Sequence, residues 1–154
     1  MIVDQDTLLF FDASCLIAAA GSSSGGSGFL LSLCARGLLQ GAVSQPVLLE
    51  AERNITAKLG IEVLNTFHRL IVLTPMTVVP TPSKSERRSY QAVAGEKDDH
   101  VVAAGVAAEA PFLLTLDKRL EAQVNQADLP IRALSPGEFI KSVLPNHVDY
   151  PSVR

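Results

Sequence analysis

Two aspartates end the most apolar runs of the chain, and other acidic residues begin helices beside them. Asp12 follows Leu-Leu-Phe-Phe, and Asp117 follows Phe-Leu-Leu-Thr-Leu. In an open parallel sheet, both side chains would project into the crevice at the carboxyl edge of the strands, where ligands bind. Glu50 and the pair Asp98-Asp99 lie in the first turns of helices that we expect to start near the same edge. The pattern predicts one crevice lined by carboxylates.

Carboxylates gathered in one crevice repel one another unless protons or cations compensate them. Oxygen ligands without cysteine favour Mg2+ or Mn2+ over zinc, and such an ion keeps water ligands that a substrate can replace. The free N–H groups at a helix start near Asp98 would also favour anions. A site of this composition is typical of phosphate chemistry.

Each acid also has a simpler structural interpretation. Asp12 and Asp117 could each cap the helix that follows them. Glu50 could be a solvated helix residue, and Asp98-Asp99 could be the acidic bias of a helix start. His100 could be a further ligand, although a lone histidine on a helix is usually structural. The residue types alone leave these alternatives open.

The elements that must position these acids alternate between short apolar runs and helical stretches, which is the pattern of a parallel sheet with helical crossovers. We expect five strands, at residues 8–11, 42–43, within 71–79, 112–116 and 131–134. We expect helices at residues 14–20, 29–36, 47–59, 61–70, 83–94, 98–109, 118–126 and 137–143. The Ser/Gly run 21–28 is expected to be a flexible loop. The prediction is a single α/β domain spanning residues 1–154.

The composition excludes several classes of protein. The chain has 13 basic and 16 acidic side chains, so no overall positive field would gather nucleic acid. Cys15 and Cys34 have no partner at metal-ligand spacing, which fits a reducing cytoplasm. Asp12 and Glu109 interrupt the two most apolar stretches, so no membrane span is expected, and residues 7–21 lack the basic flank of a signal peptide.

Other phosphate-handling motifs fit poorly. The run 21–28 lacks the Gly-Lys-Ser/Thr of a P-loop and does not join a strand directly to a helix, as a dinucleotide-binding loop does. A haloacid-dehalogenase-like phosphatase would need a second aspartate where Ser14 stands. A response-regulator receiver would need its acid pair near the first strand rather than at 98–99. Both remain minor alternatives.

Four short motifs together resemble those of the PIN domain family. They are Phe-Asp-Ala-Ser at 11–14, Ser-x-x-Val-Leu-x-Glu at 44–50, Lys-Asp-Asp-His-Val-Val-Ala-Ala at 97–104 and Leu-Thr-Leu-Asp at 114–117. Their order and their places at the ends of elements match the family over essentially the whole chain. The resemblance implies a three-layer αβα sandwich with a five-stranded parallel sheet and a metal-dependent nuclease site.

The same resemblance implies roles for individual residues. Ser14 matches the family's small hydroxyl residue beside the first acid, and Thr115 is expected to support the acids with it. Asp99 ranks second as a ligand, because the family's third acid stands four residues before the apolar part of its helix, as Asp98 does relative to Val102. The quartet that would bind Mg2+ or Mn2+ and carry catalysis is Asp12, Glu50, Asp98 and Asp117.

The implied activity is a Mg2+- or Mn2+-dependent endoribonuclease that leaves a 5′-phosphate and a 3′-hydroxyl. The run 21–28 and Glu-Arg-Asn at 52–54 resemble the VapC-like toxins of toxin-antitoxin pairs, which implies an antitoxin that inserts an arginine among the acids. The alternatives are a non-catalytic PIN-fold binding or scaffold module, which the net negative charge favours, and a housekeeping RNA-processing nuclease. The apolar segments 47–55 and 61–70 predict a homodimer.

Basic residues flank the acidic helix and follow the last acid, which predicts contacts with RNA phosphates; a solvated helix face is the alternative. Only 5% of the residues are aromatic and none is Trp, so few side chains could stack on unpaired bases and recognition of the RNA backbone is expected. The predicted RNA-contacting residues are Lys84, Arg87, Arg88, Lys97, Lys118 and Arg119.

Overall fold

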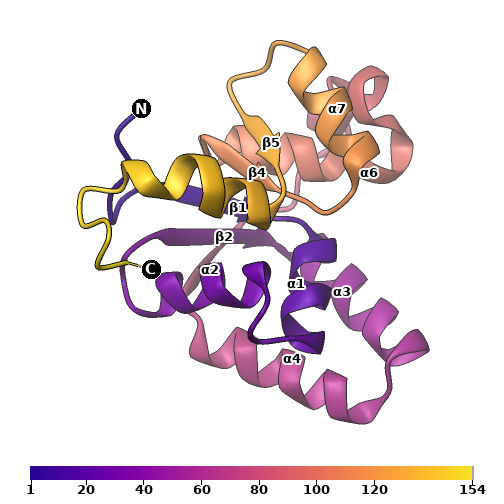
Figure 1. Ribbon diagram of the computed structural model, residues 1–154. Helices are drawn as coiled ribbons and strands as arrows, with labels where there is room; N and C mark the ends of the chain where they lie inside the picture. Colours follow the sequence, from indigo (N-terminus) through magenta and orange to yellow (C-terminus); the bar gives the residue numbers. More distant parts are fainter. Residues whose placement is uncertain (154) are drawn as a thin grey trace.

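The computed structural model describes residues 1–153 and contains one five-stranded sheet, drawn in Figure 1. The strand order is β3-β2-β1-β4-β5, and all four neighbouring pairs are parallel. The predicted five-stranded parallel sheet is therefore confirmed. The strands are β1 (Leu8–Phe11), β2 (Gln40–Ser44), β3 (Met76–Val79), β4 (Phe112–Leu114) and β5 (Arg132–Leu134).

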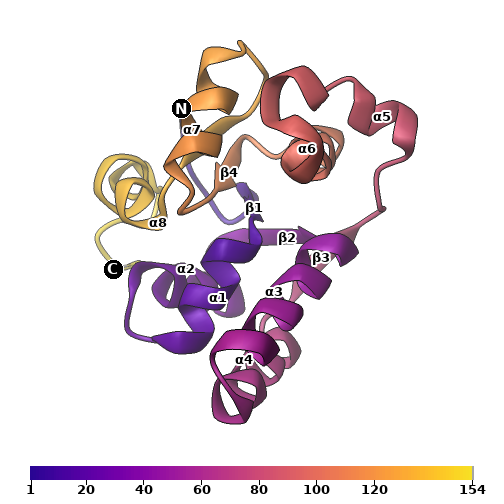
Figure 2. The ribbon, with the colours of Figure 1, turned by 90° about the vertical axis from the view of Figure 1, so that its right-hand side faces the viewer.

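Helices cover both faces of the sheet, which gives the expected three layers (Figures 1 and 2). The chain first moves outward from β1 to β3 and then returns to β4 and β5 on the other side of β1. Because such crossovers are right-handed, the reversal puts the later helices on the opposite face. One face carries α1 (Ala13–Gly21), α2 (Gly26–Ala35), α3 (Gln45–Lys58) and α4 (Ile61–Leu73). The other carries α5 (Lys84–Arg88), α6 (Gln91–Ala107) and α7 (Lys118–Gln126).

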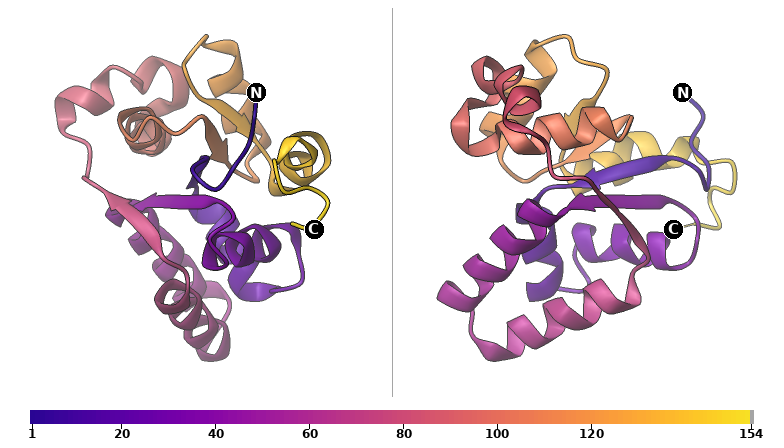
Figure 3. Two further views of the ribbon diagram at one scale, coloured as in Figure 1. Left: turned by 90° about the vertical axis from the view of Figure 1, so that its left-hand side faces the viewer. Right: turned by 180° about the vertical axis from the view of Figure 1, so that it is seen from behind.

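The C-terminal segment forms three short turns of helix and returns to the start of the chain. These are α8 (Pro136–Glu138), the π-helix η1 (Phe139–Val143) and the 3-10 helix η2 (Leu144–Asn146). The α8 turn packs against α2, and an isolated bridge joins His147 to Val3. The described residues near both ends of the chain lie at the amino-end side of the sheet, away from the carboxyl ends of the strands (Figure 3).

The core lies on both sides of β1, the central strand. Leu9, Phe10 and Phe11 are each 0% exposed, as expected for a strand with helices on both faces. α1 and α2 are largely buried against the sheet. Among residues 1–153, no single helix is long and apolar enough to span a membrane; α1 and α2 meet that test only as a pair bent by 96°.

The Ser/Gly run is not the flexible loop that its composition predicts. The α2 helix already begins at Gly26, so only residues 22–25 form a turn. A Cβ at Gly28 would clash with the backbone carbonyl of Ser23. Glycine at position 28 thus allows the turn to fold back tightly on the helix, which is a packing role that composition alone does not reveal.

The helical region between β3 and β4 also differs from the prediction. Residues 83–94 form two helices rather than one, because α5 ends at Arg88 and α6 starts at Gln91. Inside α6 the backbone breaks at Gly95, whose φ is 80° and ψ is 170°. This left-handed position favours glycine. The straight part of the helix that carries Asp98 therefore begins directly after Gly95.

Candidate active site

Asp12 is the most enclosed of the four predicted acids, at 6% exposed. It directly follows β1 and caps α1, because its Oδ1 accepts a 2.8 Å hydrogen bond from the N–H of Ala13. Its Oδ2 accepts hydrogen bonds from Ser14 Oγ at 3.1 Å and from Thr115 Oγ1 at 2.7 Å. The helix-capping and site interpretations of Asp12 are therefore compatible, since the two oxygens have different partners.

Two hydroxyl side chains tie the end of β4 to the end of β1. Thr115 Oγ1 donates to Asp12 and accepts the N–H of Asp117 at 3.1 Å. Ser14 Oγ donates to Asp12 and accepts the N–H of Leu116 at 3.0 Å. The point where β1 and β4 lie side by side is also where the strand order reverses, which is the usual ligand-binding place in an open α/β sheet.

Asp117 lies between β4 and α7 and caps α7. Its Oδ1 accepts the N–H groups of Arg119 at 2.9 Å and of Leu120 at 3.2 Å. These capping bonds fix the carboxylate at the carboxyl end of β4 and use only one of its oxygens. The residue is solvent-exposed, in contrast to the buried Asp12.

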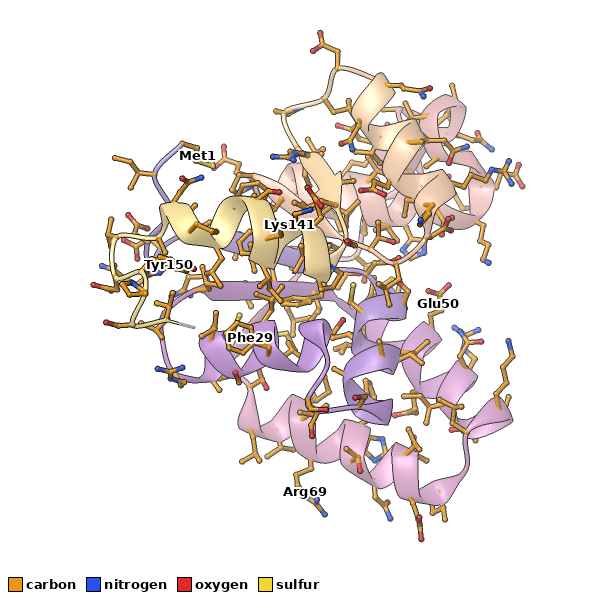
Figure 4. The ribbon with its side chains drawn as sticks, viewed as in Figure 1. Met1, Phe29, Glu50, Arg69, Lys141 and Tyr150 are labelled. Carbon is orange, nitrogen blue, oxygen red and sulfur yellow. The ribbon has the colours of Figure 1, made fainter. Side chains whose placement is uncertain are left out.

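Glu50 and Asp98 come from opposite layers and are both half-buried. Glu50 lies near the start of α3 on the carboxyl-end side of the sheet (Figure 4). Burial raises the pKa of its carboxyl above the ordinary value, and the charges of Asp12 and Asp98 raise it further. Burial likewise raises the pKa of Asp98, with added repulsion from Asp12 and Asp117. All four acids are thus coupled through their electrostatic repulsion.

Basic side chains partly offset this repulsion, and His100 is one of them at Asp98. Lys97 lowers the pKa of both Glu50 and Asp98, and Arg53 lowers that of Glu50. Lys97 is among the basic residues singled out from the sequence, whereas Arg53 is not, although it lies one helical turn beyond Glu50. Because residues three apart on a helix are neighbours, this spacing could have indicated from the sequence that Arg53 lies beside Glu50.

The four acids have the chemistry of a cation site but are not drawn together around a common point. Among residues 1–153, no three His, Cys, Asp or Glu side chains are grouped closely enough to hold one metal ion directly. Only oxygen ligands are present, and the repulsion that raises two of the pKa values is what a divalent cation would relieve. Mg2+ commonly binds through one or two carboxylates and retains several waters, so the donor set fits an ion of this type.

The second-ranked acid, Asp99, has a different partner. Its carboxylate is 4% exposed, and its Oδ1 accepts a 2.7 Å hydrogen bond from Nε of Arg87 in an ion pair. His100 lies beside it, and its buried Nδ1 has no hydrogen-bond partner. Burial lowers the pKa of His100, and the positive charge of Arg87 lowers it further. These contacts connect Asp99 to α5 rather than to the other acids.

The predicted RNA-contacting residues lie on both sides of the acids, and most are free to meet a phosphate. Lys84, Arg88 and Lys97 are exposed on α5 and α6, and a hollow of about 370 Å³ lies beside the first two. Lys118 and Arg119 are exposed at the start of α7. Arg87, by contrast, is held by Asp99 and by the carbonyl of Glu96 at 3.1 Å.

Solved structures of the same fold come from three organisms. PAE2754 from Pyrobaculum aerophilum is 19% identical, with a TM-score of 0.57 and coverage of 76% of this chain and 84% of that one. VapBC2 from Rickettsia felis, solved with a DNA fragment from its promoter, is 15% identical, with a TM-score of 0.61 and coverage of 83% and 98%. FitAcB from Neisseria gonorrhoeae is 14% identical, with a TM-score of 0.54 and coverage of 84% and 98%.

These identities are low enough that the likeness establishes the fold alone. No curated protein matches the chain at a significant level. A family model does match: that of the PIN domain covers residues 9–119, the stretch that begins in β1 and ends just past Asp117. Since the matched stretch is most of the chain and contains all four acids, the chain belongs to the PIN domain family.

Proposed function

We propose that this protein is a Mg2+- or Mn2+-dependent endoribonuclease and that it acts as the toxin of a toxin-antitoxin pair. The observation that carries the proposal is the electrostatic coupling of Asp12, Glu50, Asp98 and Asp117 at the carboxyl edge of the sheet. Such crowding of carboxylates costs free energy unless a cation is bound. Membership of the PIN domain family supports the nuclease chemistry.

The four acids would have different roles, according to how firmly each side chain is held. Asp12 is held by Ser14 and Thr115 and is the rigid acid of the site. Glu50 and Asp98, whose ionised forms are disfavoured by burial and by the neighbouring acids, would hold the cation, and a bound cation would favour their charged forms. When bound, a divalent cation supplies Lewis acidity that activates water and offsets the charge building on phosphorus. Asp117, exposed at the rim, lies where the substrate enters.

RNA would be held by its backbone on both sides of the acids. Lys84, Arg88 and Lys97 lie on one side. Lys118 and Arg119 lie on the other, with Lys118 lining a hollow of about 460 Å³ that reaches Thr115. The overall charge of −3 leaves these local groups as the source of attraction for phosphates.

The toxin assignment is supported by two of the matched structures. The matched chains come from the structures named VapBC2 and FitAcB, and the match covers 98% of each of them. We propose an antitoxin that places an arginine among the acids, and action in the cytoplasm, where both free cysteines, Cys15 and Cys34, would stay reduced.

A homodimer through the apolar segments 47–55 and 61–70 also stays part of the proposal. Val47, Ala51 and Ile55 are 0% exposed and belong to the core, so they cannot form its surface. Leu49 and Ile61, at 46% and 67% exposed, remain available in these segments on α3 and α4. Light scattering at tens of micromolar tests this part, and a strict monomer would contradict it.

The decisive test is RNA hydrolysis by purified protein with Mn2+ or Mg2+. Cleavage should stop with EDTA and in the double variant Asp12→Asn, Asp117→Asn, while the matched variant Asp6→Asn, at an exposed position outside the site, cleaves like the wild type. Products should carry a 5′-phosphate. Hydrolysis that survives EDTA or the double substitution would overturn the proposed function.

One observation favours a second candidate, a PIN-fold scaffold without turnover. Among residues 1–153, no three of the acidic side chains are grouped closely enough to ligate one ion together. Calorimetry with Mn2+ separates the two candidates. The nuclease requires a binding site that is lost in Asp12→Asn, whereas a scaffold shows no carboxylate-dependent heat.

A further inference from the structure

The guanidinium of Arg87 bonds to two residues that flank Asp98. Its Nε donates to Asp99 Oδ1 at 2.7 Å, and its Nη2 donates to the backbone carbonyl of Glu96 at 3.1 Å. Asp99 is 4% exposed, and Arg87 is the partner of its carboxylate in the structure. One side chain of α5 therefore neutralises a buried charge and holds the backbone two residues before Asp98.

The two partners of Arg87, Glu96 and Asp99, lie in the same turn of α6 as Asp98. The helix breaks at Gly95, so Glu96 to Asp99 form the first turn of its straight part. Successive helical residues point about 100° apart, so Asp98 and Asp99 leave the helix in different directions. Asp98 is the one whose charge is coupled to Asp12 and Asp117. Asp99 faces α5 and Arg87.

The geometry of α5 keeps Arg87 in place. Its first turn is closed by a capping box, in which Ser83 Oγ accepts the N–H of Glu86 and Glu86 Oε1 accepts the N–H of Ser83, both at 3.1 Å. A planar guanidinium can donate to a carboxylate and a carbonyl at once, whereas an ammonium is a single point charge. Arginine therefore suits this position better than lysine.

We propose that Arg87 is a positioning residue of the acidic site: by holding Asp99 and the carbonyl of Glu96, it determines that Asp98 faces Asp12 and that Asp99 does not. The inference rests on the proposed function only in taking the quartet as the cation site. It also replaces the role that the sequence suggested for Arg87, since a guanidinium with two internal partners must break them to bind a phosphate.

The experiment measures Mn2+ affinity by calorimetry in the absence of RNA, and RNA affinity separately. Arg87→Gln should weaken Mn2+ binding by about 10-fold or more, the usual cost of removing a group that orients a ligand. Arg87→Lys should give a smaller loss, because it keeps the charge but not both bonds. Arg69→Gln is the matched control: it removes the same charge from an exposed position on α4, well away from Glu50 (Figure 4), and should leave Mn2+ affinity unchanged.

A rescue variant distinguishes positioning from general damage. The double variant Arg87→Gln, Asp99→Asn leaves no unpaired buried charge, and its two amide side chains can hydrogen-bond to each other. Its Mn2+ affinity should therefore recover most of what Arg87→Gln alone loses. Asp99→Asn alone should weaken Mn2+ binding less than Arg87→Gln does. If Arg87→Gln does not fold, Arg87→Lys and Asp99→Asn still decide the question through the same measurement.

The outcomes separate this inference from the proposed function. If Arg87→Gln binds Mn2+ as Arg69→Gln does but binds RNA more weakly with a flatter salt dependence, Arg87 is a phosphate contact and the inference is wrong. Wild-type protein that binds no Mn2+ overturns the inference and the cation site together. Wild-type protein that binds Mn2+ and shows the Arg87 effects, but cleaves no RNA, overturns the nuclease and leaves the positioning role established.

Discussion

Thr115 and Asp12 are 103 positions apart in the chain and joined by a 2.7 Å hydrogen bond between buried side chains. The bond runs from the residue after β4 to the residue after β1, two strands that pair in parallel. The same hydroxyl also accepts the N–H of Asp117. A single threonine thus sets the relative position of the first and the last acid of the site.

Replacing Thr115 by Val should loosen this connection without changing the shape of the side chain. Asp12 Oδ2 and the N–H of Asp117 would each lose a partner, which should cost about 1–3 kcal/mol of unfolding free energy. Urea denaturation measures the loss, and Mn2+ calorimetry should show weaker binding. Thr115→Ser keeps the hydroxyl and should retain the Mn2+ affinity of the wild type, although loss of its buried methyl group costs some stability. Equal losses of Mn2+ affinity in both variants would show that the hydroxyl is not the cause.

Asp98→Asn should stabilise the metal-free protein at neutral pH. The raised pKa of Asp98 means that its ionised form is disfavoured in the folded state by burial and by Asp12. The stabilising contribution of the protonated group is present below the pKa of the unfolded chain and is lost as pH rises through the folded value. Because solvent screens a half-exposed carboxylate, the gain should be only about 0.5 kcal/mol at pH 7.

Thermal denaturation in EDTA measures this difference across pH. The two proteins should converge as the pH falls below about 3, well under the ordinary aspartate pKa, where Asp98 is protonated in both states. Mg2+ should raise the melting temperature of the wild type more than that of the variant. A metal-free variant less stable than the wild type at pH 7 would contradict the repulsion, and Asp6→Asn provides the control for loss of an acid outside the site.

Lys118 and Arg119 should contribute to RNA affinity through charge alone. Replacing both by Gln should reduce the slope of log affinity against log salt by about 1 for each phosphate that is no longer neutralised, independently of RNA sequence. Lys58→Gln, at the far end of α3, is the charge-matched control. An unchanged slope would remove the start of α7 from the RNA-binding surface.

The buried thiols should make the protein less stable in alkali. Burial raises the pKa of Cys34 from 9.0 to about 12, and burial together with the charge of Asp12 also raises that of Cys15. The stability that the neutral thiols provide is complete below pH 9 and falls as the unfolded chain ionises, by at most about 1.4 kcal/mol per pH unit per thiol.

Urea midpoints between pH 8 and 11 measure this slope, and Cys34→Ala should flatten it. Thiol-specific reagents should label the folded protein only as fast as it opens, because Cys34 is 2% exposed and Cys15 is 0% exposed. Rapid labelling under native conditions would show that the thiols are accessible and would contradict the buried arrangement.

The sequence by itself determined the elements and the acids at their ends. Apolar runs that stop at Asp12 and just before Asp117 predict β1 and β4 because a strand buried on both faces must be apolar throughout. The helix α7 has the predicted bounds, since Asp117 caps it and its apolar residues share one face. Local signals of this kind act over a few residues and can be read directly.

Only the tertiary structure decided which neighbours these residues have. The strand order that puts β4 beside β1 creates the hydrogen bond from Thr115 to Asp12. The packing of α5 on α6 creates the hydrogen bond from Arg87 to Asp99. A pattern of charges predicts Arg87 as an RNA contact but does not show that its guanidinium is paired with the buried Asp99. Contacts between distant positions depend on how whole elements pack to bury apolar surface, and that arrangement has no short-range signal in the sequence.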